Sequence, residues 1–195
     1  MNKISTDQIQ ELRKKTGVGL MEAKKALESC DGDMEQSINY LVKRGEKITL
    51  SKANRTTDQG IIDTYIHNNH KVAGVVSLLC ETDFVARTDE FKELAHEIAL
   101  QVAATRPEYL VPEDIPDDVI KKEKENYETQ VDEGKPKDIK EKIIEGKLNS
   151  YYKEACLMNQ PYIKDDSITV EELINQKVSS LGENIKVKEF AFFEI

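Results

Sequence analysis

Hydrophobic residues in the first 45 positions recur at spacings of three and four, the period of helices with one apolar face. A first helix is predicted to begin after Ser5, because Ser5 and Gln8 stand at the spacing of a capping box, and to end near Thr16. Asp33 and Gln36 have the same spacing and predict the start of a third helix. An apolar stripe between these two helices predicts the second helix. The inward-facing positions are Ile9 and Leu12, then Leu20, Ala23 and Leu27, then Met34, Ile38, Leu41 and Val42.

Residues 1–45 are therefore expected to form a compact three-helix bundle of the ubiquitin-associated-like kind, a module that usually binds a partner protein. A break at Gly17-Val18-Gly19 separates its first two helices. Cores of this size are marginal, so docking on a partner would help to stabilise the bundle. Residues 46–59 are polar and carry basic side chains, and they are predicted to form a linker.

The hydrophobic pattern changes after the linker. Residues 60–66 and 72–80 are rich in β-forming residues and enclose a turn cluster at 67–71, which predicts a β-hairpin. The second of these runs is apolar on both faces, as is typical of a central strand in a sheet covered by helices. Residues 185–195 alternate in part and predict a final strand. Its segment from Phe190 to Phe193 suits either a pairing edge or the centre of the sheet.

Helical spacing returns from residue 89. Two very charged helices are predicted at about 117–131 and 136–156, separated by a breaker cluster, and their thin apolar pattern favours an exposed helical pair. A last helix opens at Thr169 and ends at Gly182. Residues 60–195 are thus expected to form a small, mostly antiparallel sheet packed with helices, so the chain as a whole is assigned to the α+β class.

The net charge of −9 is divided unevenly along the 195 residues. Residues 1–55 hold 11 basic and 8 acidic side chains, a net charge of +3, which leaves −12 for residues 56–195. The basic segment contains a single aromatic residue, Tyr40. A modest positive charge without a stacking platform does not indicate direct binding of nucleic acid.

The composition also bears on the compartment. No stretch approaches the roughly 20 apolar residues of a membrane span, and the start of the chain does not resemble a signal or transit peptide. Cys30, Cys80 and Cys156 are scattered and indicate reduced thiols. A cytoplasmic protein without membrane contact is expected.

The residues nominate no catalytic site. His96-Glu97 lacks the second histidine of a zinc-binding H-E-x-x-H motif, because Leu100 stands in its place. Cys80 precedes the acidic Glu81, which raises a thiol pKa and disfavours a reactive thiolate. We expect no enzyme activity, no cofactor and no metal, and hence a binding protein.

One short segment, Glu81 to Arg87, places a large aromatic residue just past an aspartate at the end of the apolar strand. In one interpretation Asp83 caps the next turn and Phe84 belongs to the core. In the other, Phe84 is presented as an anchor for a partner, because aromatic residues dominate interface energetics. The pattern alone leaves both open.

Two motifs resemble the elongation factor Ts family. Residues 12–27, Leu-Arg-Lys-Lys-Thr-Gly-Val-Gly-Leu-Met-Glu-Ala-Lys-Lys-Ala-Leu, are similar to its N-terminal signature, and residues 81–87, Glu-Thr-Asp-Phe-Val-Ala-Arg, are similar to its exchange segment. Weaker likenesses lie at residues 159–166 and 189–195. The family usually has Glu and Asn ahead of the exchange segment, where Ser77 and Leu79 stand here, and this departure puts polar contacts from that strand in doubt.

The resemblance implies a guanine-nucleotide exchange factor that binds elongation factor Tu, both GDP-bound and nucleotide-free, during translation elongation. It implies that Asp83 and Phe84 disturb the Mg²⁺ site of that partner and that Thr82 and Val85 hold the turn. Magnesium bridges phosphate oxygens and protein ligands, so its loss would loosen GDP. A rival hypothesis is a scaffold in which the N-terminal bundle binds one partner and the acidic C-terminal part binds another. Such a scaffold would bind its partner regardless of which nucleotide the partner carries.

The resemblance also implies that residues 1–45 dock on the G domain of elongation factor Tu. Leu20 and Lys24 could equally be ordinary core or solvent-facing residues. The short chain resembles the compact form of the family, which works as a homodimer in a two-plus-two complex, with residues 60–195 as the exchange and dimerisation core. The implied docking residues are Arg13, Leu20, Met21 and Lys24.

Overall fold

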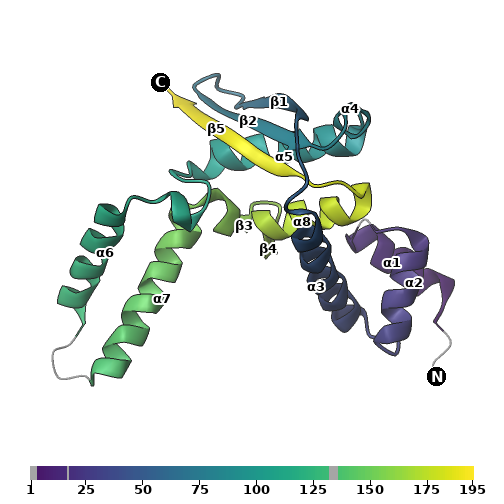
Figure 1. Cartoon of the computed structure of the whole chain (residues 1–195), viewed down its shortest axis with the longest axis horizontal. Helices are drawn as coiled ribbons and strands as arrows, with labels where there is room; N and C mark the ends of the chain where they lie inside the picture. Colours follow the sequence, from purple (N-terminus) through teal and green to yellow (C-terminus); the bar gives the residue numbers. More distant parts are fainter. Residues whose placement is uncertain (1–3, 17, 132–135) are drawn as a thin grey trace.

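The computed structural model describes residues 4–16, 18–131 and 136–195, and only the backbone of residues 46–50. The predicted breaks at Gly17 and at 132–135 lie outside the described residues. In chain order the elements are α1 (Thr6–Thr16), α2 (Leu20–Ser29), α3 (Met34–Lys52), β1 (Gln59–Ile66), β2 (Val72–Cys80), α4 (Asp83–Ala86), α5 (Asp89–Thr105), η1 (Pro112–Asp114), α6 (Asp117–Gln130), α7 (Lys137–Ala155), η2 (Leu157–Asn159), β3 (Pro161–Tyr162), β4 (Asp165–Thr169), α8 (Val170–Leu181) and β5 (Lys186–Glu194) (Figure 1).

The N-terminal helices form the predicted bundle. The Ser5 and Gln8 side chains each accept a hydrogen bond from the other's backbone N–H, at 3.2 and 2.9 Å, and Asp33 accepts one from the N–H of Gln36 at 2.9 Å. Both capping predictions are therefore confirmed. The bundle closes over a small apolar cluster in which Leu12 is fully buried, with Ile9, Val18, Ala23, Ala26, Leu27 and Leu41 around it.

The third helix is longer than predicted. Residues 46–52, predicted to be linker, continue α3 to Lys52, and only residues 53–58 connect the bundle to the sheet. A polar composition does not prevent a helix that finds tertiary support. Here α3 packs along α8, so closely that a Cβ at Gly45 would lie 3.3 Å from the carbonyl oxygen of Asn175.

The sheet has three antiparallel strands in the order β1-β2-β5. The predicted hairpin is confirmed, β2 is the central strand, and β5 lies at an edge rather than at the centre. Helix α5 covers one face with Phe91, Leu94, Ala95 and Ile98, all of them buried. It approaches β2 so closely that a Cβ at Gly74 would lie 2.2 Å from the carbonyl oxygen of Ala99.

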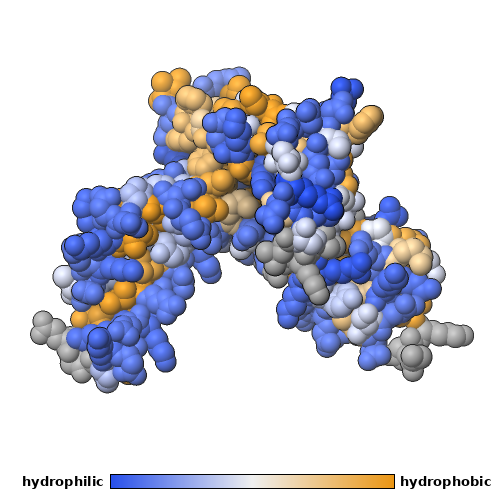
Figure 2. Space-filling view, viewed as in Figure 1, coloured by the Kyte–Doolittle hydropathy of each residue, from blue (hydrophilic) through white to orange (hydrophobic). Residues whose placement is uncertain are grey.

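The other face of the sheet differs from the expectation. The apolar character of β2 on both faces predicted helices on both, but the described residues place helices on one face only (Figure 1). Figure 2 shows hydrophobic side chains gathered over the sheet. By register, the apolar residues of the uncovered face are Ile62, Ile66, Ala73, Val75, Leu79, Ala191 and Phe193.

Helices α6 and α7 form the predicted exposed pair. They project from the body on the side away from the bundle (Figure 1). Helix α6, described in full, buries none of its side chains, and α7 buries only Leu148 and Ala155. The last helix also begins as predicted, with a reciprocal capping box between Thr169 and Glu172. The short β3–β4 pair ahead of it was not predicted.

Candidate functional site

The segment after β2 forms a single helical turn, α4, at the end of the central strand. Thr82, not Asp83, is its N-cap, and the Thr82 hydroxyl accepts a hydrogen bond from the N–H of Val85 at 3.4 Å. Phe84 is 81% exposed, whereas Val85 packs on the core and Ala86 is buried. The interpretation with Asp83 as cap and Phe84 in the core is therefore wrong. The turn points its aromatic side chain outward.

Asp83 lies beside Phe84 on the exposed turn. Its carboxylate forms an ion pair with Arg87 at 2.9 Å, one helical turn later. Both side chains are well exposed, at 45% for Asp83 and 79% for Arg87, so the pair contributes little to stability. The arrangement leaves the Asp83 carboxylate accessible from outside.

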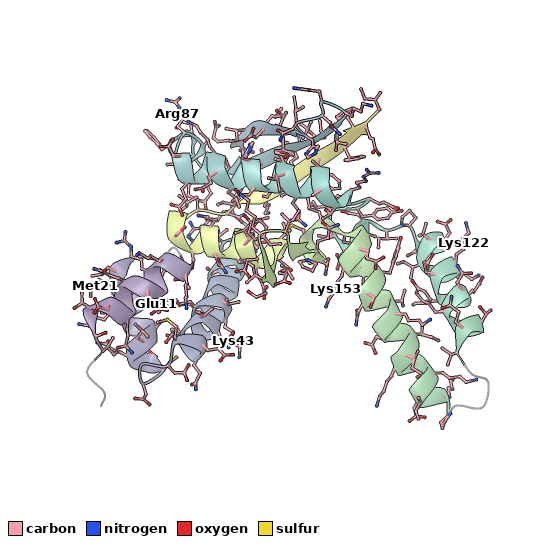
Figure 3. The ribbon with its side chains drawn as sticks, turned by 180° about the vertical axis from the view of Figure 1, so that it is seen from behind. Glu11, Met21, Lys43, Arg87, Lys122 and Lys153 are labelled. Atoms are coloured by element: carbon pink, nitrogen blue, oxygen red, sulfur yellow. The ribbon has the colours of Figure 1, made fainter. Side chains whose placement is uncertain are left out.

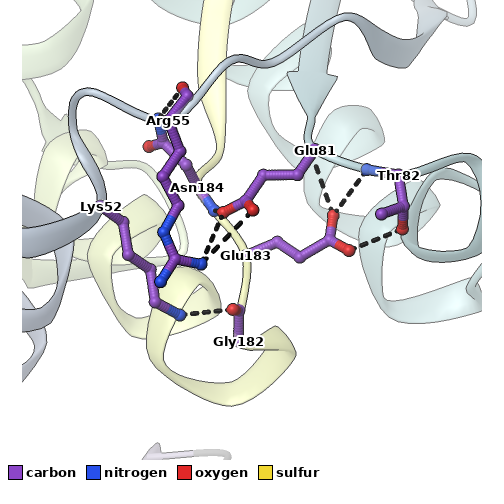
Figure 4. A network of polar contacts seen from close by, with 7 residues as sticks. All are labelled: Lys52, Arg55, Glu81, Thr82, Gly182, Glu183 and Asn184. Atoms are coloured by element: carbon purple, nitrogen blue, oxygen red, sulfur yellow. Dashed lines mark hydrogen bonds and ion pairs between the residues drawn. The ribbon is translucent and has the colours of Figure 1, made fainter.

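The base of the turn is held by residues from distant parts of the chain (Figure 4). The Glu183 carboxylate accepts hydrogen bonds from the backbone N–H groups of Glu81 and Thr82, both at 3.0 Å, and from the Thr82 hydroxyl at 2.6 Å. The Glu81 carboxylate in turn accepts one from the N–H of Asn184 at 2.7 Å and faces Arg55 at 3.4 Å. Sequence reasoning missed Arg55, Glu183 and Asn184, because no short-range pattern links them to the segment.

Cys80 lies directly beneath the turn. Its thiol is fully buried and donates a hydrogen bond to the carbonyl oxygen of Thr82 at 3.2 Å. Burial raises the pKa of this thiol to about 11, and the negative charge of Glu183 adds to the shift ahead of that of Glu81. Cys80 thus stays a protonated packing group and not a nucleophile.

The predicted docking residues lie on the bundle. Met21 is 63% exposed and Leu20 is 48% exposed at the start of α2, so Leu20 is not the core residue that its spacing suggested. Arg13 and Lys24 are exposed as well, and Lys24 pairs with Glu28 at 3.7 Å. Figure 3 shows Met21 and Arg87 on the same side of the molecule, and Figure 1 likewise shows α4 and the bundle at one end. One partner can therefore contact both.

Within the described ranges, no group of three or more His, Cys, Asp or Glu side chains is arranged to hold a metal ion. Among these residues there is also no helix that is both long and apolar enough to cross a membrane. Four cavities in the described part of the chain have volumes of about 270 to 480 Å³, and none of these four is lined by residues of α4.

A small helical head and a sheet that presents an exposed aromatic residue at one end define a protein that acts by binding a partner. The model of the family described as Elongation factor TS matches residues 3–195. The chain belongs to the elongation factor Ts family, which promotes nucleotide exchange on elongation factor Tu in translation elongation. Exchange requires binding and no covalent chemistry, so the chain is not an enzyme.

Curated relatives match along nearly their whole length. The chain is 48% identical over 189 residues to elongation factor Ts of Maridesulfovibrio salexigens, which covers 96% of the chain and 92% of the relative. It is 50% identical over 192 residues to that of Thermotoga maritima, covering 98% and 96%, and 42% identical over 196 residues to that of Desulfosudis oleivorans, covering 100% and 99%. Membership in this family decides against the plain scaffold, and the bacterial relatives support the expected cytoplasmic location.

Proposed function

We propose that Asp83 and Phe84 act as a wedge that enters elongation factor Tu beside its Mg²⁺ site and thereby promotes GDP release. The observation that carries the proposal is the 81% exposure of Phe84 on a turn fixed to the central strand. A large apolar side chain is left in water here although the core is adjacent. Such exposed aromatic residues become the dominant anchors of interfaces.

The proposed effect on GDP follows from linkage. An exchange factor must bind the nucleotide-free partner more tightly than the GDP-bound one, because a protein that binds both states equally shifts no equilibrium. A side chain that occupies space near the Mg²⁺ ion favours the empty state. Since the ion bridges phosphate oxygens and protein ligands, displacing it weakens GDP binding.

A wedge acts only if its support does not yield. Cys80 ends the central strand, Val85 packs on the core, and Ala86, the last residue of α4, is buried. Thr82 and Val85 therefore hold the turn from which Asp83 and Phe84 project. Ser77 lies on the uncovered face of the sheet by register, as does Leu79, so neither is positioned to assist the wedge.

The bundle is the proposed docking module. Exposed Met21 and Leu20 offer apolar contact area, and Arg13 and Lys24 are exposed basic residues of the same bundle. We assign these four residues to contacts with the G domain of elongation factor Tu. The contacts would raise affinity without themselves disturbing the nucleotide.

We further propose that the chain works as a homodimer through the uncovered face of its sheet. That face exposes Ile62, Ile66 and Phe193, which lie on the two edge strands around Val75 of the central strand. Two such faces can stack about 10 Å apart as in a β-sandwich. Burying these side chains against a second copy removes from water an apolar surface that a monomer leaves exposed.

The test measures release of fluorescent GDP from elongation factor Tu over a range of chain concentrations. Phe84→Ala is expected to lower the maximal release rate about 10- to 100-fold, since anchors of this kind contribute roughly 2 kcal/mol or more. The matched control is Ile139→Ala, which truncates an exposed apolar side chain on α7. If Phe84→Ala releases GDP as fast as the unaltered chain does, the wedge assignment is wrong.

A further inference from the structure

Glu183 is hydrogen-bonded to the two residues that precede the wedge, although 102 positions separate it from Glu81. One carboxylate oxygen accepts from the N–H groups of Glu81 and Thr82, and the other accepts from the Thr82 hydroxyl (Figure 4). Hydrogen bonds to an ionised group are roughly twice as strong as those between neutral groups. A single side chain therefore holds both the main chain and the cap at the start of α4.

The Thr82 hydroxyl transmits this contact to the helical turn. It has one hydrogen, which it donates to Glu183, so its lone pairs remain for the N–H of Val85. Polarised in this way, the hydroxyl is a better acceptor for that N–H. The Glu183 carboxylate thus sets the direction of the cap from which Asp83 and Phe84 project.

The support is reciprocal. Gly182 adopts the left-handed conformation, with φ of 77°, and ends α8 immediately before Glu183. Asn184, only 1% exposed, donates its N–H to the Glu81 carboxylate and its side-chain amide to the carbonyl oxygen of Arg55 at 3.2 Å. The turn after β2 and the turn before β5 are therefore tied together in both directions.

We propose that Glu183 is a positioning residue for nucleotide exchange: acting through Thr82, it fixes the angle at which α4 presents Phe84. This inference rests on the proposed role of Asp83 and Phe84. Because Phe84 is 81% exposed, its own packing contributes little to its direction. The main chain of α4 decides that direction, and Glu183 holds the main chain just before it.

The first test is Glu183→Gln in the full chain, read in the GDP-release assay. Glutamine keeps the shape, but its amide nitrogen cannot accept the Thr82 hydroxyl proton. The maximal rate is expected to fall about tenfold while the half-saturating concentration changes less than about threefold, because the docking residues are untouched. Glu125→Gln, on the exposed helix α6, is the matched control. The inference would be overturned if the maximal rate is unaltered, or if only the half-saturating concentration rises.

Two further variants separate positioning from general stability. Thr82→Val removes the hydroxyl and is expected to lower the maximal GDP-release rate about as much as Glu183→Gln does. Thr82→Ser keeps a hydroxyl, so its maximal rate is expected to be at least about fivefold higher than that of Thr82→Val. Combining Thr82→Val with Glu183→Gln is expected to cost little more than either change alone, because both break one hydrogen-bond chain. Independent, additive losses would contradict the inference. Thr82→Val also stands in if Glu183→Gln does not fold.

The second test does not depend on elongation factor Tu. Amide hydrogen exchange at Glu81 and Thr82 is expected to be at least about tenfold faster in Glu183→Gln, while the amides of α5 keep their protection. Equal protection of these amides in Glu183→Gln and in the unaltered chain would refute the positioning role, even if the unaltered chain promotes GDP release. If the unaltered chain fails to release GDP, the proposed function fails, and this measurement still reports separately whether Glu183 holds the turn.

Discussion

Arg87 holds the carboxylate of Asp83 at 2.9 Å across one exposed turn of α4. Exposed pairs at this spacing contribute only about 0.3–0.5 kcal/mol, so the pairing orients the carboxylate more than it stabilises the fold. The acid and the aromatic side chain of the wedge are consequently presented together, on a turn whose base is tied to the sheet.

Asp83→Asn tests the acidic half of the wedge. We expect a maximal GDP-release rate about tenfold lower, because the amide has no charge with which to disturb a Mg²⁺ site, and unfolding by urea unchanged within about 0.5 kcal/mol. Asp118→Asn, which removes a similar exposed pair with Lys122 on α6, is the control. A rate equal to that of the unaltered chain would show that Phe84 alone carries the wedge.

Met21→Asp tests docking by the bundle. Placing a charge on the most exposed apolar residue of α2 is expected to raise the half-saturating concentration about tenfold and to leave the maximal rate unchanged. Tyr40→Asp alters an exposed residue of the same bundle on α3 and is expected to have no effect. Point variants suit this test better than removal of the bundle, because α3 packs on α8. An unaltered concentration dependence for Met21→Asp would exclude the docking assignment.

Phe193→Asp tests the homodimer. A charge buried within a stacked sheet interface has no partner, so the mass measured by light scattering is expected to fall from twice 22.2 kDa to that of a single copy. Ile163→Asp, an exposed isoleucine in the β3–β4 turn, should remain dimeric. A monomer already in the unaltered protein would refute the homodimer.

Gly74→Ala tests the close approach of α5 to the sheet. A Cβ here would lie 2.2 Å from the carbonyl oxygen of Ala99 and 2.8 Å from the backbone nitrogen of Ala103, so α5 must shift. We expect a loss of roughly 1–3 kcal/mol in the free energy of unfolding. Gly146→Ala on α7, where a Cβ meets nothing within 4 Å, is expected to stabilise by about 0.5–1 kcal/mol. Equal effects of the two variants would contradict the close packing.

The buried thiol of Cys80 predicts a pH dependence. Its pKa is raised by burial from an ordinary value of 9.0 to about 11, so between these values the unfolded chain binds fewer protons than the folded one. The thiol's contribution to stability is therefore complete below pH 9.0 and is lost as the pH rises to about 11, by about 2 kcal/mol. Urea unfolding across this range measures it. Cys80→Ser, which keeps a donor for the Thr82 carbonyl, should show a smaller decline, and an equal decline would assign the effect to other groups.

Much of the local structure could be predicted because its determinants lie within a few residues. The pairs Ser5 with Gln8 and Asp33 with Gln36 close hydrogen bonds across three positions, so the sequence window contains both partners. The apolar run at 72–80 likewise contained the reason for its central place, because a strand with apolar residues on both faces needs neighbours. The exposure of α6 and α7 could be predicted because these helices have many charged residues and few apolar ones.

Other features were decided by contacts between distant elements. Polar residues 46–52 are helical because α3 packs on α8, and the sequence of that stretch alone does not indicate this contact. Strand β2 is apolar on both faces, but among the described residues helices cover only one face of the sheet. The solvent position of Phe84 depends on Thr82, rather than Asp83, taking the cap.

The sequence by itself determined the class of fold, the family and the segment expected to act on the partner, since each is written in a continuous run of residues. The tertiary structure alone decided how that segment is held. Glu183 reaches Thr82 only because β5 pairs with β2 and brings the turn after Gly182 to the end of the central strand. A hydrogen bond between residues this far apart depends on which surfaces meet during folding, and no local spacing encodes it.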